Sequence, residues 1–255
     1  MVGTVQNRRI SIEMSTLVPP KTFFINCPIC GGKRHKLLFR LGTKVFPMDI
    51  ALCETCGFVT QNPRVSEEDW KAYYETGVYD KYHRPRPTKE NGASNDTARI
   101  TYQRIMDFLD RQYTREGESD SVLEKIGCAT RVLEVGAGDG SIIETFKGMT
   151  LYAIEPSASC RAICQKKGIT VLQSNELKDT TGPDMPMFFD IIIIRHVLEH
   201  IYYPKNMVEE MIRLLGSRGI LYIAVPDFLS PNSLNSFTYP HISYFTHHSL
   251  RLFVN

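Results

Sequence analysis

The segment from residue 131 to residue 227 alternates short apolar runs with amphipathic stretches, and this alternation limits the fold more than any other feature of the chain. Apolar runs separated by helical patterns are typical of β-α-β units, in which successive strands lie parallel and helices cover both faces of the sheet. The run 189–194 is nearly all isoleucine, which suits a central strand buried on both faces. We therefore predict an α/β fold with a doubly wound, mostly parallel, Rossmann-like sheet.

The composition is that of an ordinary globular chain. Of its 255 residues, 42% are apolar and 23% are charged, which argues against the disordered and fibrous classes. Lys and Arg number 30 against 28 Asp and Glu, so the net charge of +2 provides no general basic field for nucleic acid. No apolar run is long enough to span a membrane, and residues 1–20 lack an apolar signal core. We expect a cytoplasmic protein that does not associate with membranes.

Four cysteines form two CxxC pairs, and a glycine follows each pair. Zinc takes four soft ligands in a tetrahedron, and a glycine after the second cysteine permits the tight turn behind the thiolates. Without a secretion signal, the doubled spacing favours a metal over two disulfides or a redox pair. The stretch between the pairs reads as strand-forming sequence, so residues 21–60 are predicted to form a zinc ribbon. The predicted ligands of this closed, structural site are Cys27, Cys30, Cys53 and Cys56.

A glycine-rich turn follows the first apolar run, where residues 134–140 read EVGAGDG. Glycines let backbone N–H groups approach a ligand, and a helix predicted from Ser141 onward adds a field that favours a carboxylate or a phosphate. The glycine order is GxGxG, whereas dinucleotide-binding loops read GxGxxG. This difference argues against a nicotinamide cofactor. Glu155 follows the next predicted strand, where it is placed to accept hydrogen bonds from both hydroxyls of a ribose.

Three motifs in order, VLEVGAGDG, AIEPS and FFDIIIIRHVLEHI, resemble the class I methyltransferases that use S-adenosyl-L-methionine (SAM). The resemblance covers residues 130–230 and implies SAM as the cofactor. It implies that the three glycines line the methionine side, that Glu155 clamps the ribose, and that Asn175 stands where an acid usually faces the adenine amine. The residues so expected to bind SAM are Glu134, Gly136, Gly138, Asp139, Gly140, Glu155, Pro156, Asn175 and His196.

The ribbon together with HVLEHI and PHISYFTHHSL resembles, more narrowly, the zinc-ribbon methyltransferases that include sugar C-methyltransferases. This likeness implies that the segment between ribbon and methyltransferase domain supplies a tyrosine to the active site, here Tyr73 or Tyr74. The carbon-methylating members carry a glutamate directly before the histidine that matches His241. Pro240 stands at that position here, so carbon, oxygen and nitrogen all remain open as the acceptor atom.

Methyl transfer from a sulfonium needs an aligned nucleophile and, for many acceptors, a base. His196 directly follows the isoleucine-rich strand, at the edge where doubly wound sheets bind their ligands. His241 lies in a polar and aromatic stretch after the fifth predicted strand. We predict that these two histidines are the candidate bases. His200 is expected to pack or to support a turn, whereas His247 and His248 are expected to be exposed on a helix that Thr246 caps.

The resemblance and the composition together predict four parts of the chain. Residues 1–20 are a loose arm, 21–60 the zinc ribbon, 61–130 a helical connector that contributes to an active-site lid, and 131–255 the SAM-binding methyltransferase domain. The connector is expected to carry helices from residue 67 and from residue 97. The family's sheet normally ends in two further strands, one of them antiparallel, and the residues after 225 leave no room for both. We therefore expect either a truncated sequence or an incomplete sheet whose edge is exposed or paired with another chain.

The function these features favour is methyl transfer to a small-molecule acceptor, such as a sugar or nucleotide sugar in saccharide or natural-product biosynthesis. One alternative is an RNA-base methyltransferase whose ribbon binds RNA, which the basic run at 33–36 supports. A second alternative is a catalytically inactive SAM-binding module, which Pro240 and Asn175 permit. The sequence does not indicate the oligomeric state.

Overall fold

We analysed a computed structural model of the chain, which describes residues 21–42, 47–75, 92–114, 130–172, 188–230, 237–238 and 240–252. The arm predicted at residues 1–20 and the predicted adenine contact Asn175 lie outside these residues. Among the described helices, none is both long enough and apolar enough to cross a membrane.

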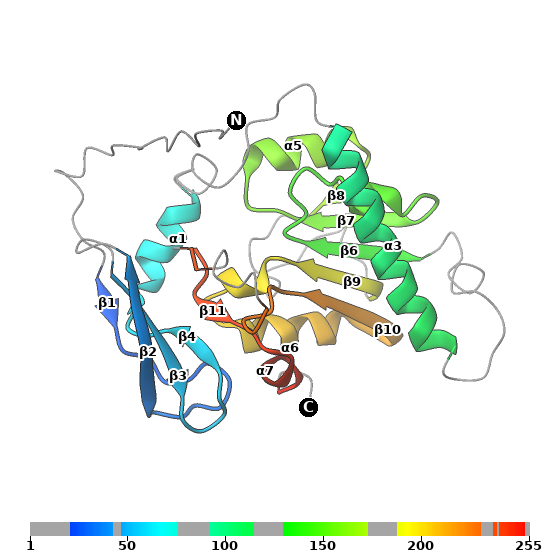
Figure 1. The fold of residues 1–255 in the computed structure, drawn as a ribbon. Coiled ribbons are helices and arrows are strands. Elements are labelled where there is room, and N and C mark those ends of the chain that lie inside the picture. The colour runs from blue at the N-terminus through cyan, green and yellow to red at the C-terminus, as the bar shows by residue number, and fades with distance from the viewer. Residues whose placement is uncertain are drawn as a thin grey trace, which may run out of the picture.

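A five-stranded parallel sheet forms the centre of the molecule, in the order β10-β9-β6-β7-β8 (Figure 1). Its strands are β6 (Arg131–Val135), β7 (Thr150–Ile154), β8 (Thr170–Val171), β9 (Phe189–Arg195) and β10 (Leu215–Ala224). Each neighbouring pair is parallel, as the alternation of apolar runs predicts. The chain moves outward from β6 through β8 and then returns to the other side of β6 with β9. The crevice beyond the carboxyl ends of β6 and β9 is therefore the place where such sheets bind ligands.

Helices cover both faces of this sheet. Along β9, Ile191 and Ile193 pack with the side chains of α3 (Gly92–Thr114), whereas Ile192 and Ile194 pack with those of α6 (Pro204–Leu214). Successive side chains of a strand point to opposite faces, so a continuous isoleucine run supplies both cores. The fold is thus an α/β, doubly wound, Rossmann-like sheet, as predicted. β10 is its last strand on one side within the described residues.

The prediction of a helix directly after the glycine-rich turn is wrong. The structure forms only a single 3-10 turn there, η2 (Ile143–Thr145), before the chain enters β7. Two adjacent isoleucines and a threonine disfavour a helix because their branched side chains crowd the preceding turn. The first regular helix after the loop is α5 (Ala158–Lys166), which follows β7.

The ribbon is a four-stranded antiparallel sheet in the order β11-β4-β3-β2, in which one strand comes from the far end of the chain (Figure 1). Its members are β2 (His35–Gly42), β3 (Pro47–Cys53), β4 (Val59–Gln61) and β11 (Ser243–Tyr244). A short pair, β1 (Thr22–Phe23) with β5 (Arg64–Val65), lies beside it. β11 lies in the stretch predicted to hold the acceptor, so a strand of the predicted methyltransferase domain completes the ribbon sheet.

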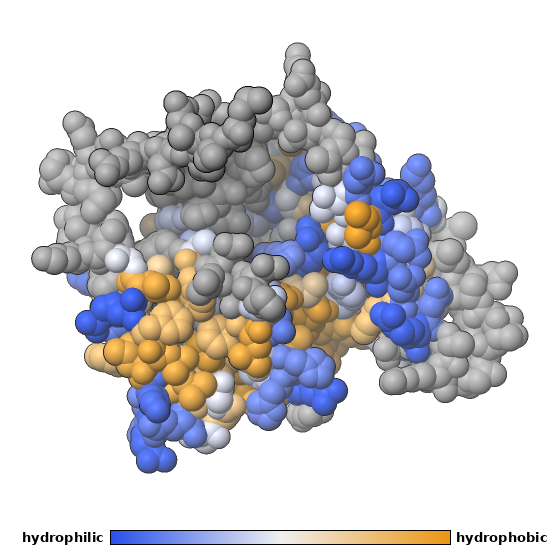
Figure 2. Space-filling view, viewed as in Figure 1, coloured by the Kyte–Doolittle hydropathy of each residue, from blue (hydrophilic) through white to orange (hydrophobic). Residues whose placement is uncertain are grey.

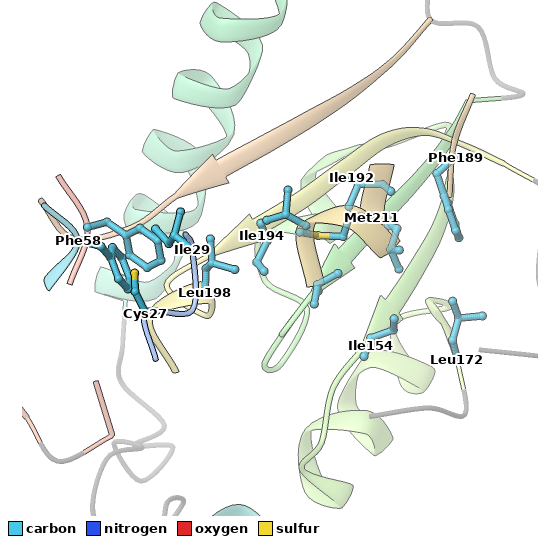
Figure 3. Packing of buried hydrophobic residues seen from close by; sticks show 14 of the residues in the cluster. Cys27, Ile29, Phe58, Ile154, Leu172, Phe189, Ile192, Ile194, Leu198 and Met211 are labelled. Atoms are coloured by element: carbon cyan, nitrogen blue, oxygen red, sulfur yellow. The ribbon is translucent and has the colours of Figure 1, made fainter. Parts of the chain in front are cut away.

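The ribbon and the parallel sheet also share a hydrophobic core. Cys27, Ile29 and Phe58 of the ribbon belong to the same buried cluster as Ile194 and Leu198 beside the parallel sheet (Figure 3). Figure 2 shows that hydrophobic surface extends outward over the ribbon. Loss of the ribbon would therefore expose apolar surface of the larger domain as well.

The predicted connector helices are present in the described part of the chain. Helix α1 (Glu67–Glu75) begins after Ser66, whose hydroxyl accepts a hydrogen bond from the backbone N–H of Asp69 at 3.1 Å. Helix α3 begins at Gly92, five residues earlier than predicted. The carboxyl-terminal helix α7 (His247–Arg251) has the predicted cap, since the Thr246 hydroxyl accepts from the Ser249 N–H at 3.0 Å, and His247 and His248 are exposed.

A buried arginine joins the ribbon to the parallel sheet. Arg64 is 1% exposed and donates to the carbonyl oxygen of Tyr202 at 2.8 Å, to the Thr60 hydroxyl, and to the carbonyl oxygen of Ile242 at 3.3 Å. Burial lowers the pKa of Arg64 to about 10, so the guanidinium remains charged near neutral pH. The side chain therefore connects β4, the chain before β11 and the loop before α6.

Replacement of Arg64 by alanine is expected to destabilise the protein by about 3–5 kcal/mol, because it leaves a cavity and removes the donor from three buried acceptors. Urea unfolding of the zinc-loaded protein measures this loss. Arg40→Ala is the matched control, since Arg40 is largely exposed in its ion pair with Asp49 and surface pairs contribute little. Equal unfolding midpoints for the two variants would contradict the role assigned to Arg64.

Candidate functional site

The four predicted zinc ligands meet at one end of the ribbon. All four Sγ atoms lie within 4.8 Å of one another, with 3.5 Å between Cys27 and Cys56 and 3.6 Å between Cys30 and Cys53. A tetrahedral site with zinc–sulfur bonds of about 2.3 Å separates its sulfur atoms by about 3.8 Å. The residues therefore fit a zinc ion with little movement of any side chain.

The two cysteine turns have the same backbone design. Gly31 N–H donates to the Cys27 carbonyl oxygen and Gly57 N–H donates to the Cys53 carbonyl oxygen, each at 2.9 Å. Burial raises the pKa of Cys27 to about 11 and also raises the pKa of Cys56. Both thiols would thus be protonated near neutral pH, and a bound zinc ion would hold them as thiolates.

The glycine-rich loop after β6 meets an acid at the end of β7. The Glu155 carboxylate is 2% exposed and accepts hydrogen bonds from Gly138 N–H at 2.8 Å and from Ser157 N–H at 2.9 Å. Pro156 is next in the chain, and its carbonyl oxygen accepts from Arg161. The sequence-based prediction placed Glu155 and the loop in one site, and the structure brings them into direct contact.

Asp139 and Gly140 complete the turn of this loop. Ser141 donates to the Asp139 carboxylate through its N–H at 3.1 Å and through its hydroxyl. Burial acts to raise the pKa of Asp139, but these hydrogen bonds outweigh it and hold the pKa below its ordinary value. Gly140 N–H donates to the Ala137 carbonyl oxygen at 2.9 Å. Both residues therefore shape the loop next to Gly138.

The loop has the space and the unpaired polar group that SAM requires. A Cβ added to Gly138 would have no atom within 4 Å, so the space in front of its backbone is open. Glu134 on β6 is 3% exposed, and its Oε2 atom has no hydrogen-bond partner among the described residues. An ammonium group can donate a hydrogen bond to such an oxygen. The residues thus fit the cofactor: the Glu155 carboxylate would face the ribose, and Glu134 would accept from the amino group.

Burial raises the pKa of Glu134 to about 8 from an ordinary value of 4.5, against the opposing attraction of Arg195. Between these two values the folded protein holds a proton that the unfolded chain releases, so the free energy of unfolding falls as the pH rises. One such group contributes a slope of at most about 1.4 kcal/mol per pH unit. Glu134→Gln is expected to flatten this decline between pH 5 and 8, measured by denaturant unfolding without SAM. An identical slope in parent and variant would be evidence against the raised pKa.

Alanine substitutions at Gly136 and Gly138 are expected to have different effects, the first mainly on stability and the second mainly on SAM binding. Both have positive φ, +73° at Gly136 and +59° at Gly138, which costs an alanine about 1–2 kcal/mol. A Cβ at Gly136 would also lie 2.3 Å from Cγ2 of Val197, so Gly136→Ala should lower the unfolding temperature more than Gly138→Ala does. Gly138→Ala should instead weaken SAM binding out of proportion to its stability loss. Calorimetric unfolding and SAM titration of both variants test the contrast, and the reverse order would contradict it.

Histidines and a glutamate gather beyond the carboxyl end of β9. His200 and Glu199 lie on the 3-10 turn η4 (Leu198–His200), and His241 precedes β11. One potential ligand atom from each of these residues lies within 4.8 Å of the others, and the rings of His200 and His241 are 4.7 Å apart, edge to face. The structure therefore brings the predicted base His241 to the edge where His196 also lies.

The ribbon holds His241 in this position. Gln61 on β4 donates its side-chain amide to the His241 carbonyl oxygen at 2.8 Å. The backbone N–H of Gln61 donates to the Ile242 carbonyl oxygen at 3.1 Å, and the Ile242 N–H donates to the Glu199 carbonyl oxygen at 3.0 Å. The position of His241 relative to Glu199 therefore depends on the ribbon strands.

His196 has an unusual backbone conformation at the end of β9. Among the described non-glycine residues, only His196 has a positive φ, which is +52°. Its backbone N–H donates to the Ala224 carbonyl oxygen at 2.9 Å. The imidazole is half-exposed, with Nδ1 3.5 Å from Oε1 of Glu199. Strained residues of this kind cluster at functional sites, because the surrounding structure must enforce them.

The two candidate tyrosines have different neighbours. The Tyr74 hydroxyl lies 3.1 Å from Nδ1 of His200, which places the end of α1 beside the histidines. Tyr73 stacks on Trp70, with ring centroids 5.9 Å apart. Trp70 in turn donates its indole N–H to the His200 carbonyl oxygen at 3.0 Å. Tyr74 therefore contacts the cluster through His200, and Tyr73 packs on Trp70 of the same helix.

Sequence reasoning missed Glu199 and gave His200 only a supporting role. A signal was present, because residues 196, 199 and 200 share one face of a short helical turn if a turn follows the strand. The contribution of β11 to the ribbon had no comparable signal, since a two-residue strand gives no readable alternation.

Comparison with known proteins places the chain among methyltransferases. A family model described as a methyltransferase domain matches residues 97–254. An uncharacterized protein of Methanocaldococcus jannaschii is 32% identical over 100 residues, which cover 38% of this chain and 45% of that protein. A ubiquinone biosynthesis O-methyltransferase of Pseudomonas fluorescens is 25% identical over 108 residues, which cover 40% and 47%. The chain thus spans about half the length of either relative.

The solved structures that resemble this chain include a SAM-dependent methyltransferase of Thermotoga maritima. The TM-score is 0.47 and the identity is 17%, with 72% of this chain and 78% of that chain covered. A SAM-dependent methyltransferase of Archaeoglobus fulgidus gives a TM-score of 0.44 at 18% identity, with 60% and 66% covered. Because the family model matches more than half of the residues, the chain belongs to the methyltransferase domain family.

Proposed function

We propose that the protein transfers the methyl group of SAM to a small-molecule acceptor at the carboxyl edge of the parallel sheet. The observation that carries this proposal is the Glu155 carboxylate at the N–H of Gly138, beside open space and at the same edge as the histidine cluster. SAM supplies an electrophilic methyl group on a sulfonium. The protein's own task is to bind the cofactor, align the acceptor and accept a proton where the acceptor carries one.

The residues divide this task between the two sides of the crevice. On the cofactor side, Glu155 accepts hydrogen bonds from ribose hydroxyls, and Glu134 accepts from the amino group. On the acceptor side, His196 and His241 are the candidate bases, since imidazole takes up a proton near neutral pH. Attack by the acceptor oxygen or nitrogen would form the bond to the methyl carbon as the carbon–sulfur bond breaks. S-adenosylhomocysteine would leave, and the acceptor's proton would pass to one of these rings.

Tyr74 belongs to the acceptor side. Its hydroxyl lies at His200 and is carried by α1, which follows the ribbon directly. A phenol can both donate to and accept from a hydroxyl-rich molecule. Together with the four-cysteine ribbon behind His241, this supports the narrower proposal that the acceptor is a sugar or nucleotide sugar.

Methyl-labelled SAM incubated with the zinc-loaded protein and a cell extract tests the proposal. Label should appear in small polar molecules. His196→Ala and His241→Ala should both lower the rate, and SAM binding should persist in His241→Ala. Label in RNA would establish the alternative acceptor class. SAM binding without transfer to any fraction would favour a binding module and contradict the proposed catalysis.

A further inference from the structure

Glu199 is a buried acid to which the described residues donate no hydrogen bond. The side chain is 2% exposed, and neither carboxylate oxygen has a hydrogen-bond partner among the described residues. Its Oε1 atom lies 3.5 Å from Nδ1 of His196, which is an ion-pair distance. A buried carboxylate without donors is costly unless a cation balances it.

The hydrogen bonding of His200, next to Glu199 in the chain, defines which of its ring nitrogens carries the proton. Its Nδ1 atom lies 2.8 Å from the carbonyl oxygen of Pro240, and a carbonyl oxygen can only accept. Nδ1 therefore carries the proton, and Nε2 carries the lone pair. Histidines that bind metals commonly donate the other ring N–H to a backbone carbonyl in this way, which fixes the ring and its tautomer.

His241 brings a second imidazole to the same place. Potential ligand atoms of Glu199, His200 and His241 all lie within 4.8 Å of one another. Two imidazoles and one carboxylate are a ligand set for divalent transition metals, and three protein ligands leave coordination positions for water or a substrate oxygen. The four-cysteine site, by contrast, is closed.

We propose that Glu199, His200 and His241 bind a divalent transition-metal ion that is separate from the ribbon zinc. The open positions of this ion would hold oxygen atoms of the methyl acceptor, so the acceptor class is a molecule with one or more hydroxyls. That second part rests on the proposed methyl transfer. A metal-bound imidazole nitrogen cannot accept a proton, so with His241 as a ligand the candidate base of the proposed transfer would be His196 alone.

Metal counting on the zinc-loaded full chain tests the site. The protein, with its ribbon zinc verified, is equilibrated with Co²⁺ alone, and bound cobalt and zinc are measured after removal of free metal. One cobalt per chain should bind in addition to the zinc. Its absorption should lack the sulfur-to-cobalt charge-transfer band that cobalt in the cysteine site would show.

Variants separate this site from other sites. Glu199→Gln and His241→Gln should each weaken cobalt binding by about tenfold or more. The exposed His248→Ala should leave it unchanged, and all three variants should retain the ribbon zinc, which reports folding. Two different ligand variants keep the test informative if one of them fails to fold.

The outcomes are distinct. No cobalt beyond the cysteine site, or cobalt that binds equally to the ligand variants, would overturn the metal site. Loss of binding in His248→Ala would assign the ion to the exposed pair on α7 and would overturn it as well. Methyl transfer without a second metal refutes this site alone, whereas cobalt binding in a protein that does not bind SAM refutes the proposed function.

Discussion

Removal of the ribbon zinc is expected to unfold the ribbon and to displace His241 from the histidine cluster. A structural zinc site contributes about 10–16 kcal/mol in small zinc domains, and a whole domain is stable by only about 5–15 kcal/mol. The ribbon core continues into the core of the parallel sheet, and β11 pairs with β4. The effect of zinc loss therefore reaches the methyltransferase domain.

Cys53→Ser tests this expectation without a chelator. The variant should retain little zinc, unfold at a much lower temperature and lose methyl transfer, because Cys53 is fully buried in the shared core. Cys160→Ser is the matched control, a buried cysteine on α5 away from the ribbon, and it should retain zinc. A zinc-free protein with an unchanged unfolding temperature and unchanged methyl transfer would contradict the structural role of the site.

Replacement of Glu155 by alanine is expected to weaken SAM binding by about a hundredfold. A hydrogen bond to a charged group contributes about 1.5–3 kcal/mol, and the carboxylate is placed to accept from two ribose hydroxyls. Glu155→Gln retains one acceptor oxygen, so its SAM affinity should fall less, by about tenfold. Calorimetric titration with SAM measures both variants.

Glu155 also supports the loop, so the titration needs a structural control. The carboxylate accepts from Gly138 and Ser157 in the described structure, and its loss will lower stability to some extent. Glu144→Gln removes a more exposed carboxylate from the neighbouring turn, where it pairs with Lys167, and should leave SAM affinity unchanged. A Glu155→Ala protein that is folded and binds SAM within twofold of the parent would contradict the assignment.

The sequence predicts the parallel sheet well because its longer strands have local sequence patterns. The isoleucine run of β9 and the turn between β6 and η2 are short-range patterns that depend on burial and on glycine. The four-cysteine cluster is predictable for the same reason, since the spacing within each pair fixes two ligands and the doubled pattern supplies the rest. Zinc binding itself stays a prediction.

The parts that the sequence does not predict depend on contacts between distant segments. Arg64 looks like an ordinary surface arginine until its bonds to Tyr202 and Ile242 are seen. Glu199 is likewise one acid in a helical turn, and its burial follows from the way β11 and the ribbon close over η4. The missing helix after the loop reflects a different limit, because branched side chains and a short connection outweigh the usual strand–turn–helix pattern.

Equilibrium titration of the zinc-loaded chain with SAM, and in parallel with NAD, tests whether the glycine-rich loop and Glu155 form a SAM site. One SAM should bind per chain, S-adenosylhomocysteine should compete for the site, and NAD should not bind, because the loop reads GxGxG and not the GxGxxG of dinucleotide-binding loops. Binding of NAD with no binding of SAM would contradict the account, since the loop, Glu134 and Glu155 would then serve a different cofactor.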